Sequence, residues 1–352
     1  MGRPVGRALA RDLGESDPQD IVRIATFNYV HVVVAAGFES APDLVDAVPD
    51  DLVIYFREMQ AANLRRNAAI RAQMREVGAV LAAEGVCGVV LKGGAELLDP
   101  VFPNPAFRFL SDLDILLPEP DIARIFARLR RDGAFVAEGS DISEIDSRAH
   151  HHLPPLGGPG WPVPLELHRW LGQGAYRDLL DPGTVAATAQ PSASAGLFVP
   201  SSAYRLAHLV QHAQLQPPRF RDRDFSLRDT VEMEVMRRKF APQDVATARR
   251  LLDAEGRAAW DALEATCTLL FDGSEAVADL SPEARGWGER AIAGFGRPGQ
   301  RRAGMLGRWA GWYAKELLSN PERRRHYLSQ LRKPGSLRRL LFEQRDRWRR
   351  TR

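Results

Sequence analysis

A short apolar run enclosed by helix-forming sequence most constrains the fold of this chain. Val86–Leu91 is rich in β-branched residues, and Lys92-Gly93-Gly94 follow it directly. Such a run, bounded by glycine, is typical of a buried strand that ends in a tight turn. On its N-terminal side, Asp51–Glu84 carries apolar residues at helical spacing and stops at Gly85, a residue type that commonly ends helices. The chain therefore combines sheet with long helices.

Strand-like and helix-like segments alternate over the middle of the chain. Ser111–Leu117 is predicted as a strand, Pro120–Arg131 as a helix and Ala134–Ala137 as a further strand. Ala149–Leu153 and Pro164–Trp170 flank a segment rich in glycine and proline, which indicates a hairpin.

The sequence on either side of this middle part is helical. Residues 21–34 are apolar enough for one buried helix, and a Ser/Ala/Pro-rich connection, Gln190–Gly196, precedes a series of helices that reaches Glu322–Leu331. We therefore predict an α+β fold with a small mixed-sheet core flanked by helical regions. Its predicted parts are a helical N-terminal region (1–85), the core (86–200) and a helical C-terminal region with a basic tail (201–352).

Composition and charge exclude several classes of protein. The 352 residues are 26% charged and 45% hydrophobic, which are ordinary globular proportions. Two cysteines are too few for a disulfide scaffold. The longest apolar run, near Tyr29–Gly37, is far shorter than the ~20 residues of a membrane span, and the N-terminus has no apolar signal segment. We expect a cytoplasmic protein with no membrane span.

The last part of the chain is strongly basic. Residues 301–352 hold sixteen Lys and Arg against four Asp and Glu, whereas the net charge of all residues is +3. Such a tail attracts nucleic acid, an anionic membrane surface or an acidic partner. Tryptophans and leucines interleave with these charges, which also fits the solvated faces of amphipathic helices, so both interpretations stay open.

Two of the predicted strands carry carboxylates in an alternating pattern. Side chains alternate faces along a strand, so Asp112 and Asp114 share one face, and Glu166 and His168 share a face of the later strand. Neighbouring carboxylates repel each other unless a cation lies between them. Three carboxylates on two adjacent strands would form an oxygen-ligand site suited to Mg²⁺ or Mn²⁺.

Lys92-Gly93-Gly94 forms a turn at which backbone N–H groups approach an anion closely, because glycine has no side chain. The turn is not a Walker A loop, since the lysine precedes the glycines, and it is not a dinucleotide-binding fingerprint either. Taken alone, a Gly-Gly turn between a strand and a helix is more often purely structural.

These motifs, in this order, resemble the polymerase-beta-like nucleotidyltransferase superfamily, and within it the family of uncharacterised nucleotidyltransferases. The resemblance covers about residues 52–235. The matching segments are Leu91-Lys92-Gly93, Arg108 to Asp114, Glu166-Leu167-His168, His212 and Leu227-Arg228-Asp229. Two features depart from the pattern: 18 positions separate Gly94 from Asp112, and the third carboxylate is Glu where Asp is commoner.

The resemblance implies an enzyme that moves a nucleoside monophosphate from a nucleoside triphosphate, such as ATP, to a hydroxyl acceptor by a two-metal mechanism. It implies that Asp112, Asp114 and Glu166 are catalytic and hold Mg²⁺, with Mn²⁺ as a substitute. Glu166 would also help to deprotonate the acceptor. The acceptor is a small molecule, a peptide or RNA, and nothing in the sequence chooses among them.

The resemblance also implies how nucleotide and acceptor are contacted. It assigns nucleotide contacts to Lys92, Gly93, Gly94 and Ser111. Arg108 would contact phosphate or form a salt bridge, with Asp112 as the nearest candidate partner. His168 would contact the acceptor or phosphate, or serve as a hydrogen-bonded structural histidine.

The remaining histidines fall into two groups. Strand alternation would place His150 and His152 on one face, and the run His150-His151-His152 has no further ligand at the usual metal-site spacing. His208 and His212 are four residues apart on a predicted helix, and we expect them to pack or to form hydrogen bonds. Asp229 is expected to cap a helix or to pair within the helical region.

Two alternative functions stay open. The first is a metal-dependent phosphohydrolase built from Asp112, Asp114, His150–His152 and His168. The second is a non-catalytic protein that binds RNA or a protein partner through the basic tail. The three carboxylates argue against the second function, because a protein without catalytic activity has no physical need to hold like charges together.

Overall fold

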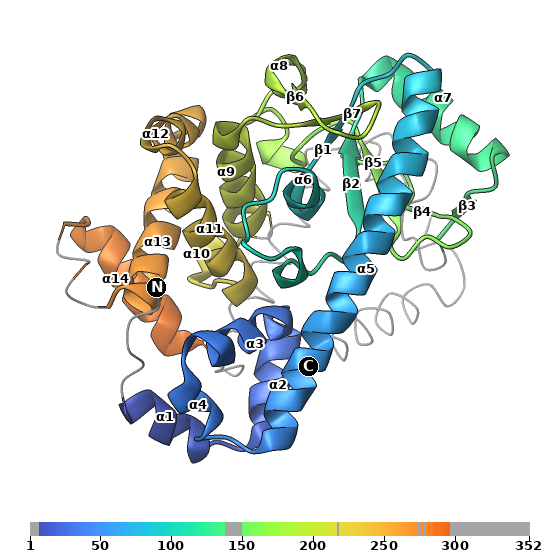
Figure 1. Ribbon diagram of the computed structural model, residues 1–352. Helices are drawn as coiled ribbons and strands as arrows, with labels where there is room; N and C mark the ends of the chain where they lie inside the picture. The colour runs from blue at the N-terminus through green and yellow to red at the C-terminus, as the bar shows by residue number, and fades with distance from the viewer. Residues whose placement is uncertain (1–6, 138–149, 217, 274–275, 277–278, 296–352) are drawn as a thin grey trace, which may run out of the picture. The chain divides into compact units, whose positions relative to one another are not determined.

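The computed structural model describes residues 7–137, 150–216, 218–273, 276 and 279–295 of the chain (Figure 1). The basic tail and the helices expected within it lie outside these residues. The strands are β1 (Gly88–Val90), β2 (Leu113–Leu116), β3 (Phe135–Val136), β4 (Leu156–Gly157), β5 (Leu165–His168), β6 (Gln190–Pro191) and β7 (Leu197–Val199). They form a seven-stranded sheet in the order β3-β4-β5-β2-β1-β7-β6. With helices packed around it, this sheet confirms the predicted α+β class.

Helices make up most of the remaining described chain. The first seven are α1 (Arg7–Gly14), α2 (Pro18–Phe27), α3 (His31–Ser40), α4 (Pro42–Val45), α5 (Asp50–Ala83), α6 (Lys92–Leu98) and α7 (Glu119–Arg131). The later ones are α8 (Pro182–Thr188), α9 (Ser202–Val210), α10 (Arg219–Asp222), α11 (Leu227–Lys239), α12 (Pro242–Leu251), α13 (Ala254–Phe271) and α14 (Pro282–Gly294). Among the described helices, none combines the length and the apolar character needed to cross a bilayer.

Strand pairing in the sheet is mixed. β1 is antiparallel to β2 and parallel to β7, whereas β2 is parallel to β5. β4 is antiparallel to β5, and a bridge between His152 and His168 extends this pairing. The hairpin predicted on either side of the Gly/Pro segment is therefore confirmed.

Helix α5 covers one face of the sheet, along which it runs in Figure 1. It begins after Pro49, and Gly85, with a φ of +67°, ends the segment in the left-handed conformation that glycine tolerates. Buried side chains of α5 pack against the apolar residues of β2 and β5; they are Ile70, Met74, Val77 and Leu81 on the helix and Leu113, Ile115, Leu165 and Leu167 on the strands.

The other face of the sheet packs against the helices that follow residue 200. Leu116 of β2 and Val89 of β1 belong to a core that includes residues of α9, α11 and α13. Because side chains alternate along β2, Asp114 lies on the same face as Leu116. The polar face of the sheet is thus turned toward these helices.

Two local predictions were wrong. Residues 21–34 form two helices instead of one, because Tyr29 adopts a left-handed φ of +55° between α2 and α3 and stacks its ring on Phe109 at 5.4 Å. Part of the predicted connection Gln190–Gly196 is strand β6, and β7 follows it beside β1. A strand of two or three residues is too short to show a periodic pattern in the sequence. Such a strand becomes visible only through its hydrogen-bonded pairing with a neighbouring strand.

The division of the chain into three regions, with boundaries after residues 85 and 200, stays a prediction. Helix α5 ends close to the first of them, and β7 ends close to the second.

Candidate active site

The register of β2 against β5 brings the predicted carboxylates together. Asp114 is the direct neighbour of Glu166, and Leu116 is the neighbour of His168. Asp112 stands two residues before Asp114, at the entry to β2. The expectation that these two strands are adjacent, with Asp114, Glu166 and His168 on a common face, is therefore confirmed.

Asp114 is the centre of a buried group of charges. Its Oδ1 atom lies 2.8 Å from Lys92 Nζ and 2.7 Å from His168 Nε2, and the latter lies 3.4 Å from Glu166 Oε2. Burial opposes ionisation of Asp114, but the Lys92 ammonium and the hydrogen bond from His168 hold the pKa of this carboxyl well below its usual range. Asp114 is thus ionised and paired with two protein groups.

The pKa values of Lys92 and His168 shift upward, opposite to that of Asp114. Burial lowers the pKa of both, but the carboxylate of Asp114 outweighs it, so that the pKa of Lys92 and the pKa of His168 are both raised. Lys92 also has a φ of +49°, a strained conformation for a residue with a side chain. The chain keeps this conformation at the residue whose ammonium lies beside the carboxylates.

Asp112 differs from Asp114 in having no ion-pair partner among the described residues. Burial, together with the charge of Asp114, raises the pKa of Asp112 to about 6. A carboxylate of this kind gains from a bound cation, because the cation supplies the missing counter-charge.

The donor atoms fit a divalent cation. One ligand atom each from Asp114, Glu166 and His168 lies within 4.8 Å of the others. Two of these three groups are carboxylates, and Asp112 stands on the same side of the sheet. Mg²⁺ and Mn²⁺ prefer such oxygen ligands.

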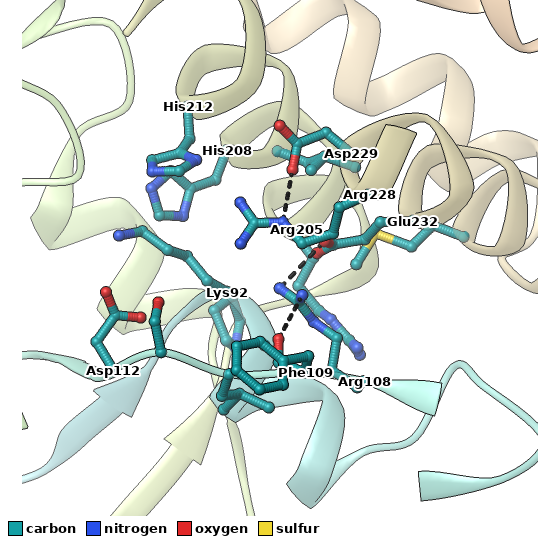
Figure 2. Close-up of a pocket in the computed structure, with 16 residues that line it drawn as sticks. Lys92, Arg108, Phe109, Asp112, Arg205, His208, His212, Arg228, Asp229 and Glu232 are labelled. Atoms are coloured by element: carbon teal, nitrogen blue, oxygen red, sulfur yellow. Dashed lines mark hydrogen bonds and ion pairs between the residues drawn. The ribbon is translucent and has the colours of Figure 1, made fainter. Parts of the chain in front are cut away.

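A cavity of about 120 Å³ adjoins this group of charges (Figure 2). Lys92, Gly93, Ser111 and Asp112 contribute to its wall from the sheet side. Asp114, Glu166 and His168 are not among its lining residues and lie beside it, next to Lys92. Ser111 donates a hydrogen bond to Asp112, which lowers the pKa of that carboxyl against the larger effect of burial.

The helical side of the cavity is basic, which the sequence analysis missed. Arg205, His208 and His212 reach it from α9 and the π-helical turn Gln211–Leu215, and Arg228 reaches it from α11 (Figure 2). The spacing of the first three residues places them on one helix face, a signal that was present in the sequence. The two histidines therefore line the cavity instead of only packing in the core.

These basic groups differ in charge. Burial, reinforced by the charge of Lys92, lowers the pKa of His208 to about 3, so this imidazole is neutral. Burial opposes the charge of Arg228, but Asp229 outweighs it and raises the pKa of this guanidinium. Arg205 pairs with Asp99 at 2.6 Å. Each guanidinium keeps further N–H donors, which suit the oxygens of a phosphate.

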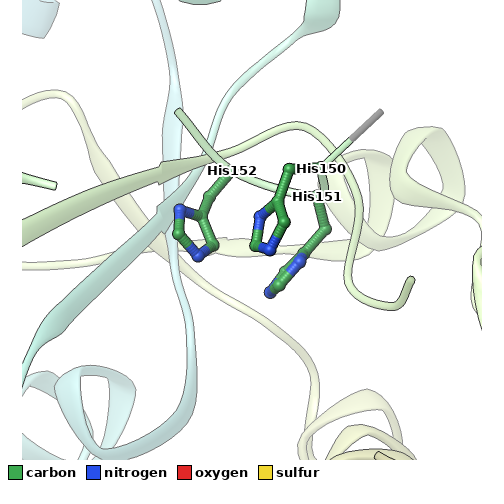
Figure 3. Close-up of side chains that lie close together, drawn as sticks. All are labelled: His150, His151 and His152. Atoms are coloured by element: carbon green, nitrogen blue, oxygen red, sulfur yellow. The ribbon is translucent and has the colours of Figure 1, made fainter. Parts of the chain in front are cut away.

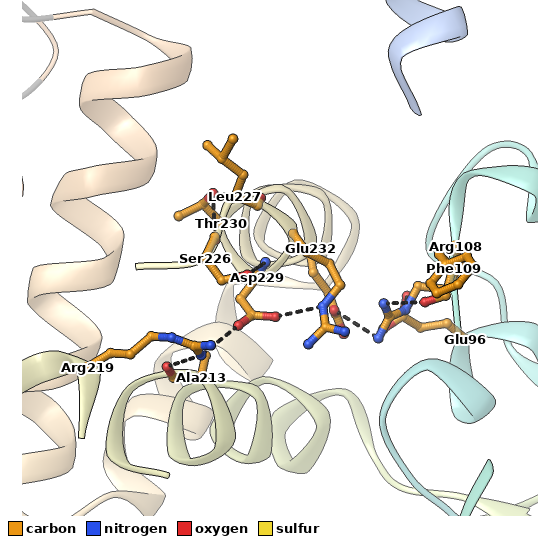
Figure 4. Close-up of polar contacts among 11 residues, drawn as sticks. Glu96, Arg108, Phe109, Ala213, Arg219, Ser226, Leu227, Asp229, Thr230 and Glu232 are labelled. Carbon is orange, nitrogen blue, oxygen red and sulfur yellow. Dashed lines mark hydrogen bonds and ion pairs between the residues drawn. The ribbon is translucent and has the colours of Figure 1, made fainter. Parts of the chain in front are cut away.

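Arg108 does not pair with Asp112. It is buried and lies 3.3 Å from Glu96 Oε2 and 3.1 Å from Glu232 Oε2 (Figure 4). The predicted salt bridge exists, but its partners are on α6 and α11, because the guanidinium extends toward the helices and away from β2. Asp229, as expected, pairs within the helical region.

Asp229 pairs with Arg219 at 3.3 Å (Figure 4). It also pairs with Arg228 at 3.0 Å. Buried charges on α6, α11 and the turn before β2 thus meet between the sheet and the helices.

The two glycines of the turn allow close packing. A Cβ atom at Gly93 would lie 2.7 Å from Arg108 Nε, and one at Gly94 would lie 2.7 Å from Val90 Cγ1 and 3.0 Å from Leu113 Cδ1. Gly94 therefore faces the apolar core, and any contact of this residue with phosphate would involve its backbone N–H alone.

We expect Gly94→Ala to destabilise the protein by about 1–3 kcal/mol, because overpacking a buried site forces its neighbours to shift. Gly37→Ala is the matched control, since a Cβ atom there meets nothing within 4 Å and alanine favours the helix by up to about 1 kcal/mol. Urea unfolding followed by circular dichroism measures both. A Gly94→Ala variant as stable as Gly37→Ala would contradict the close packing.

The three consecutive histidines do not alternate as a strand would. Their ring centroids lie 4.4–4.6 Å apart, and the rings of His151 and His152 lie 5.0 and 5.1 Å from that of His168 (Figure 3). The expectation that His150 and His152 share a face without His151 is wrong, because in the described part of the chain this segment pairs with β5 through one bridge, at His152, and does not continue as a regular strand.

Comparison with known proteins agrees with the fold and the motifs. A model of the family described as uncharacterised nucleotidyltransferase matches residues 14–263. No curated protein matches the sequence at a significant level. The matched range contains the strands of the sheet, the paired carboxylates and the basic cavity. The chain therefore belongs to the uncharacterised nucleotidyltransferase family, whose activity is the transfer of a phosphorus-containing nucleotidyl group.

Proposed function

We propose that the protein transfers a nucleoside monophosphate from a nucleoside triphosphate to a hydroxyl group, with Mg²⁺ held by Asp112, Asp114 and Glu166. The observation that carries this proposal is the parallel register of Asp114 and Glu166, with Asp112 at the wall of a basic cavity. Mn²⁺ would serve in place of Mg²⁺, since both prefer oxygen ligands.

The cavity supplies binding for the triphosphate. Lys92, Arg205 and Arg228 surround it with positive charge, and Ser111 adds a hydroxyl. In phosphoryl transfer the protein acts mainly by positioning and by charge stabilisation. These groups would therefore orient the α-phosphorus toward the carboxylates.

Glu166 is suited to receive the proton of the acceptor. Its side chain is 17% exposed, more open than Asp114 at 3%. Burial opposes its ionisation, but the hydrogen bond from His168 lowers the pKa of Glu166, so the carboxylate is available as a base. The acceptor hydroxyl gives its proton to Glu166, its oxygen bonds to the α-phosphorus, and pyrophosphate leaves. When bound, Mg²⁺ offsets the negative charge of the phosphates and makes the hydroxyl more acidic.

The second candidate is a metal-dependent phosphohydrolase. This function is favoured by two histidines that stand beside the carboxylates. His168 Nε2 lies 2.7 Å from Asp114 Oδ1, and His152 Nε2 lies 3.4 Å from Glu166 Oε2. Imidazole nitrogens together with carboxylates suit the transition metals that such hydrolases would use. Binding of RNA or a protein through residues 301–352 stays a prediction, because this tail lies outside the described residues.

The test is incubation of the full chain with each α-labelled nucleoside triphosphate, Mg²⁺, and separate fractions of small molecules, RNA and protein. We expect one fraction to become labelled and pyrophosphate to be released in an amount equal to the label transferred. The double variant Asp112→Asn/Asp114→Asn is the control and should give neither product. Base preference and acceptor class follow from which nucleotide and which fraction are labelled. Release of inorganic phosphate with Mn²⁺, Fe²⁺ or Zn²⁺, without any nucleotidyl product, would favour the phosphohydrolase.

A further inference from the structure

Three neighbouring imidazoles meet at His150, His151 and His152 (Figure 3). One ring nitrogen from each lies within 4.8 Å of the other two. Three adjacent residues rarely converge in this way, since alternation along a strand would turn the middle one away. The convergence therefore needs an explanation.

Backbone hydrogen bonds hold the three histidines in place. Leu153 N donates to Leu167 O at 3.0 Å, and Arg169 N donates to His151 O at 2.8 Å. Both bonds tie the segment to the end of β5, a strand with buried partners on either side. The backbone of the cluster is thus held beside β5 before any ligand binds, which lowers the entropy cost of binding.

The hydrogen bonding of the rings suits metal coordination. His152 Nδ1 lies 2.7 Å from Leu153 O, and as the donor it leaves the lone pair on Nε2. His151 Nδ1 is buried without a hydrogen-bond partner among the described residues. A hydrogen bond from one ring nitrogen to a carbonyl commonly orients the other nitrogen toward a metal.

We propose that His150, His151 and His152 form a binding site for a divalent transition-metal ion of the zinc type. Three imidazole nitrogens suit Zn²⁺, Co²⁺ or Ni²⁺, whereas Mg²⁺ prefers oxygen. Glu166 Oε2, 3.4 Å from His152 Nε2, provides negative charge beside the ion. This site differs in its ligands from the Mg²⁺ site proposed at the carboxylates, and it does not depend on the transfer reaction.

Metal binding to the full chain, purified without a histidine tag and stripped with a chelator, tests the site. Zn²⁺ is titrated by calorimetry in the presence of excess Mg²⁺, and Co²⁺ is followed by its visible absorption. We expect one equivalent of Zn²⁺ to bind, with nitrogen-ligand Co²⁺ bands. His151→Asn and, separately, His150→Asn should each weaken Zn²⁺ binding at least about tenfold.

Two controls distinguish this site from others. Cys87→Ser, which removes an exposed thiol, should leave Zn²⁺ affinity unchanged. Circular dichroism shows whether each variant is folded. If one of the two histidine variants does not fold, the other one still tests the site. Zn²⁺ affinity unchanged in both folded histidine variants, or lost in Asp114→Asn and retained in His151→Asn, would overturn the proposal.

Discussion

Asp112→Asn and Asp114→Asn are each expected to slow nucleotidyl transfer by at least about 10³-fold, while they change the stability of the metal-free protein in opposite directions. A carboxylate that holds a catalytic cation contributes several kcal/mol to transition-state stabilisation, and each ~1.4 kcal/mol corresponds to tenfold in rate. Both substitutions remove one negative charge and keep the shape of the side chain, so they form a matched pair.

The opposite effects on stability follow from the partners of the two carboxylates. Asp114 pairs with Lys92 at 2.8 Å and with His168 at 2.7 Å, so Asp114→Asn leaves a buried ammonium without its counter-charge. Breaking a buried ion pair costs about 3–5 kcal/mol. In Asp112, burial and the charge of Asp114 raise the pKa from 3.8 to about 6, so its ionised form disfavours the fold. Asp112→Asn should therefore stabilise the protein at neutral pH by up to about 3 kcal/mol.

Denaturant unfolding in a chelator measures this difference at pH 7 and again near pH 4. Because the folded-state pKa of Asp112 is raised, its cost to the fold develops between about pH 4 and pH 6, and the gain from Asp112→Asn should be largely absent at the lower pH. Equal destabilisation by the two variants would show that the Lys92 ammonium does not need Asp114 as its counter-charge. Full activity in either variant would remove that residue from the proposed metal site.

Glu166→Gln and Leu167→Asp should separate catalysis from folding on a single strand. Glu166 is the proposed base, so Glu166→Gln is expected to slow the chemical step about 10²–10⁴-fold and to leave nucleotide affinity largely unchanged. Leu167 is 1% exposed and belongs to the core beneath α5. A charge there costs several kcal/mol, enough to unfold a protein whose total stability is about 5–15 kcal/mol.

Circular dichroism reports folding, and single-turnover pyrophosphate release reports chemistry. Calorimetry with a non-hydrolysable nucleoside triphosphate and Mg²⁺ reports binding. A well-folded Leu167→Asp variant would show that the two faces of β5 are reversed. Loss of nucleotide binding in a folded Glu166→Gln variant would make Glu166 a binding residue and not the base.

The local pattern of the sequence predicted several elements and one face of the site correctly. Helix α5 ends at Ala83, before Gly85, and α7 (Glu119–Arg131) matches the helix predicted for Pro120–Arg131. Alternation within each strand predicted that Asp112 shares a face with Asp114, and that Glu166 shares a face with His168. The register of β2 against β5 then brings Asp114 and Glu166 side by side. These features depend on residues a few positions apart, and local spacing describes such residues completely.

The sequence by itself determined which residues form the polar face of the sheet, but the partner of each charge was decided by the tertiary structure. Lys92 pairs with Asp114, and Arg108 pairs with Glu96 and Glu232 instead of Asp112. The basic wall of the cavity and the meeting of the three histidines likewise arise from segments far apart in the chain. Long flexible side chains reach several ångströms in many directions, and only the packing of helices against the sheet selects which charge each one meets.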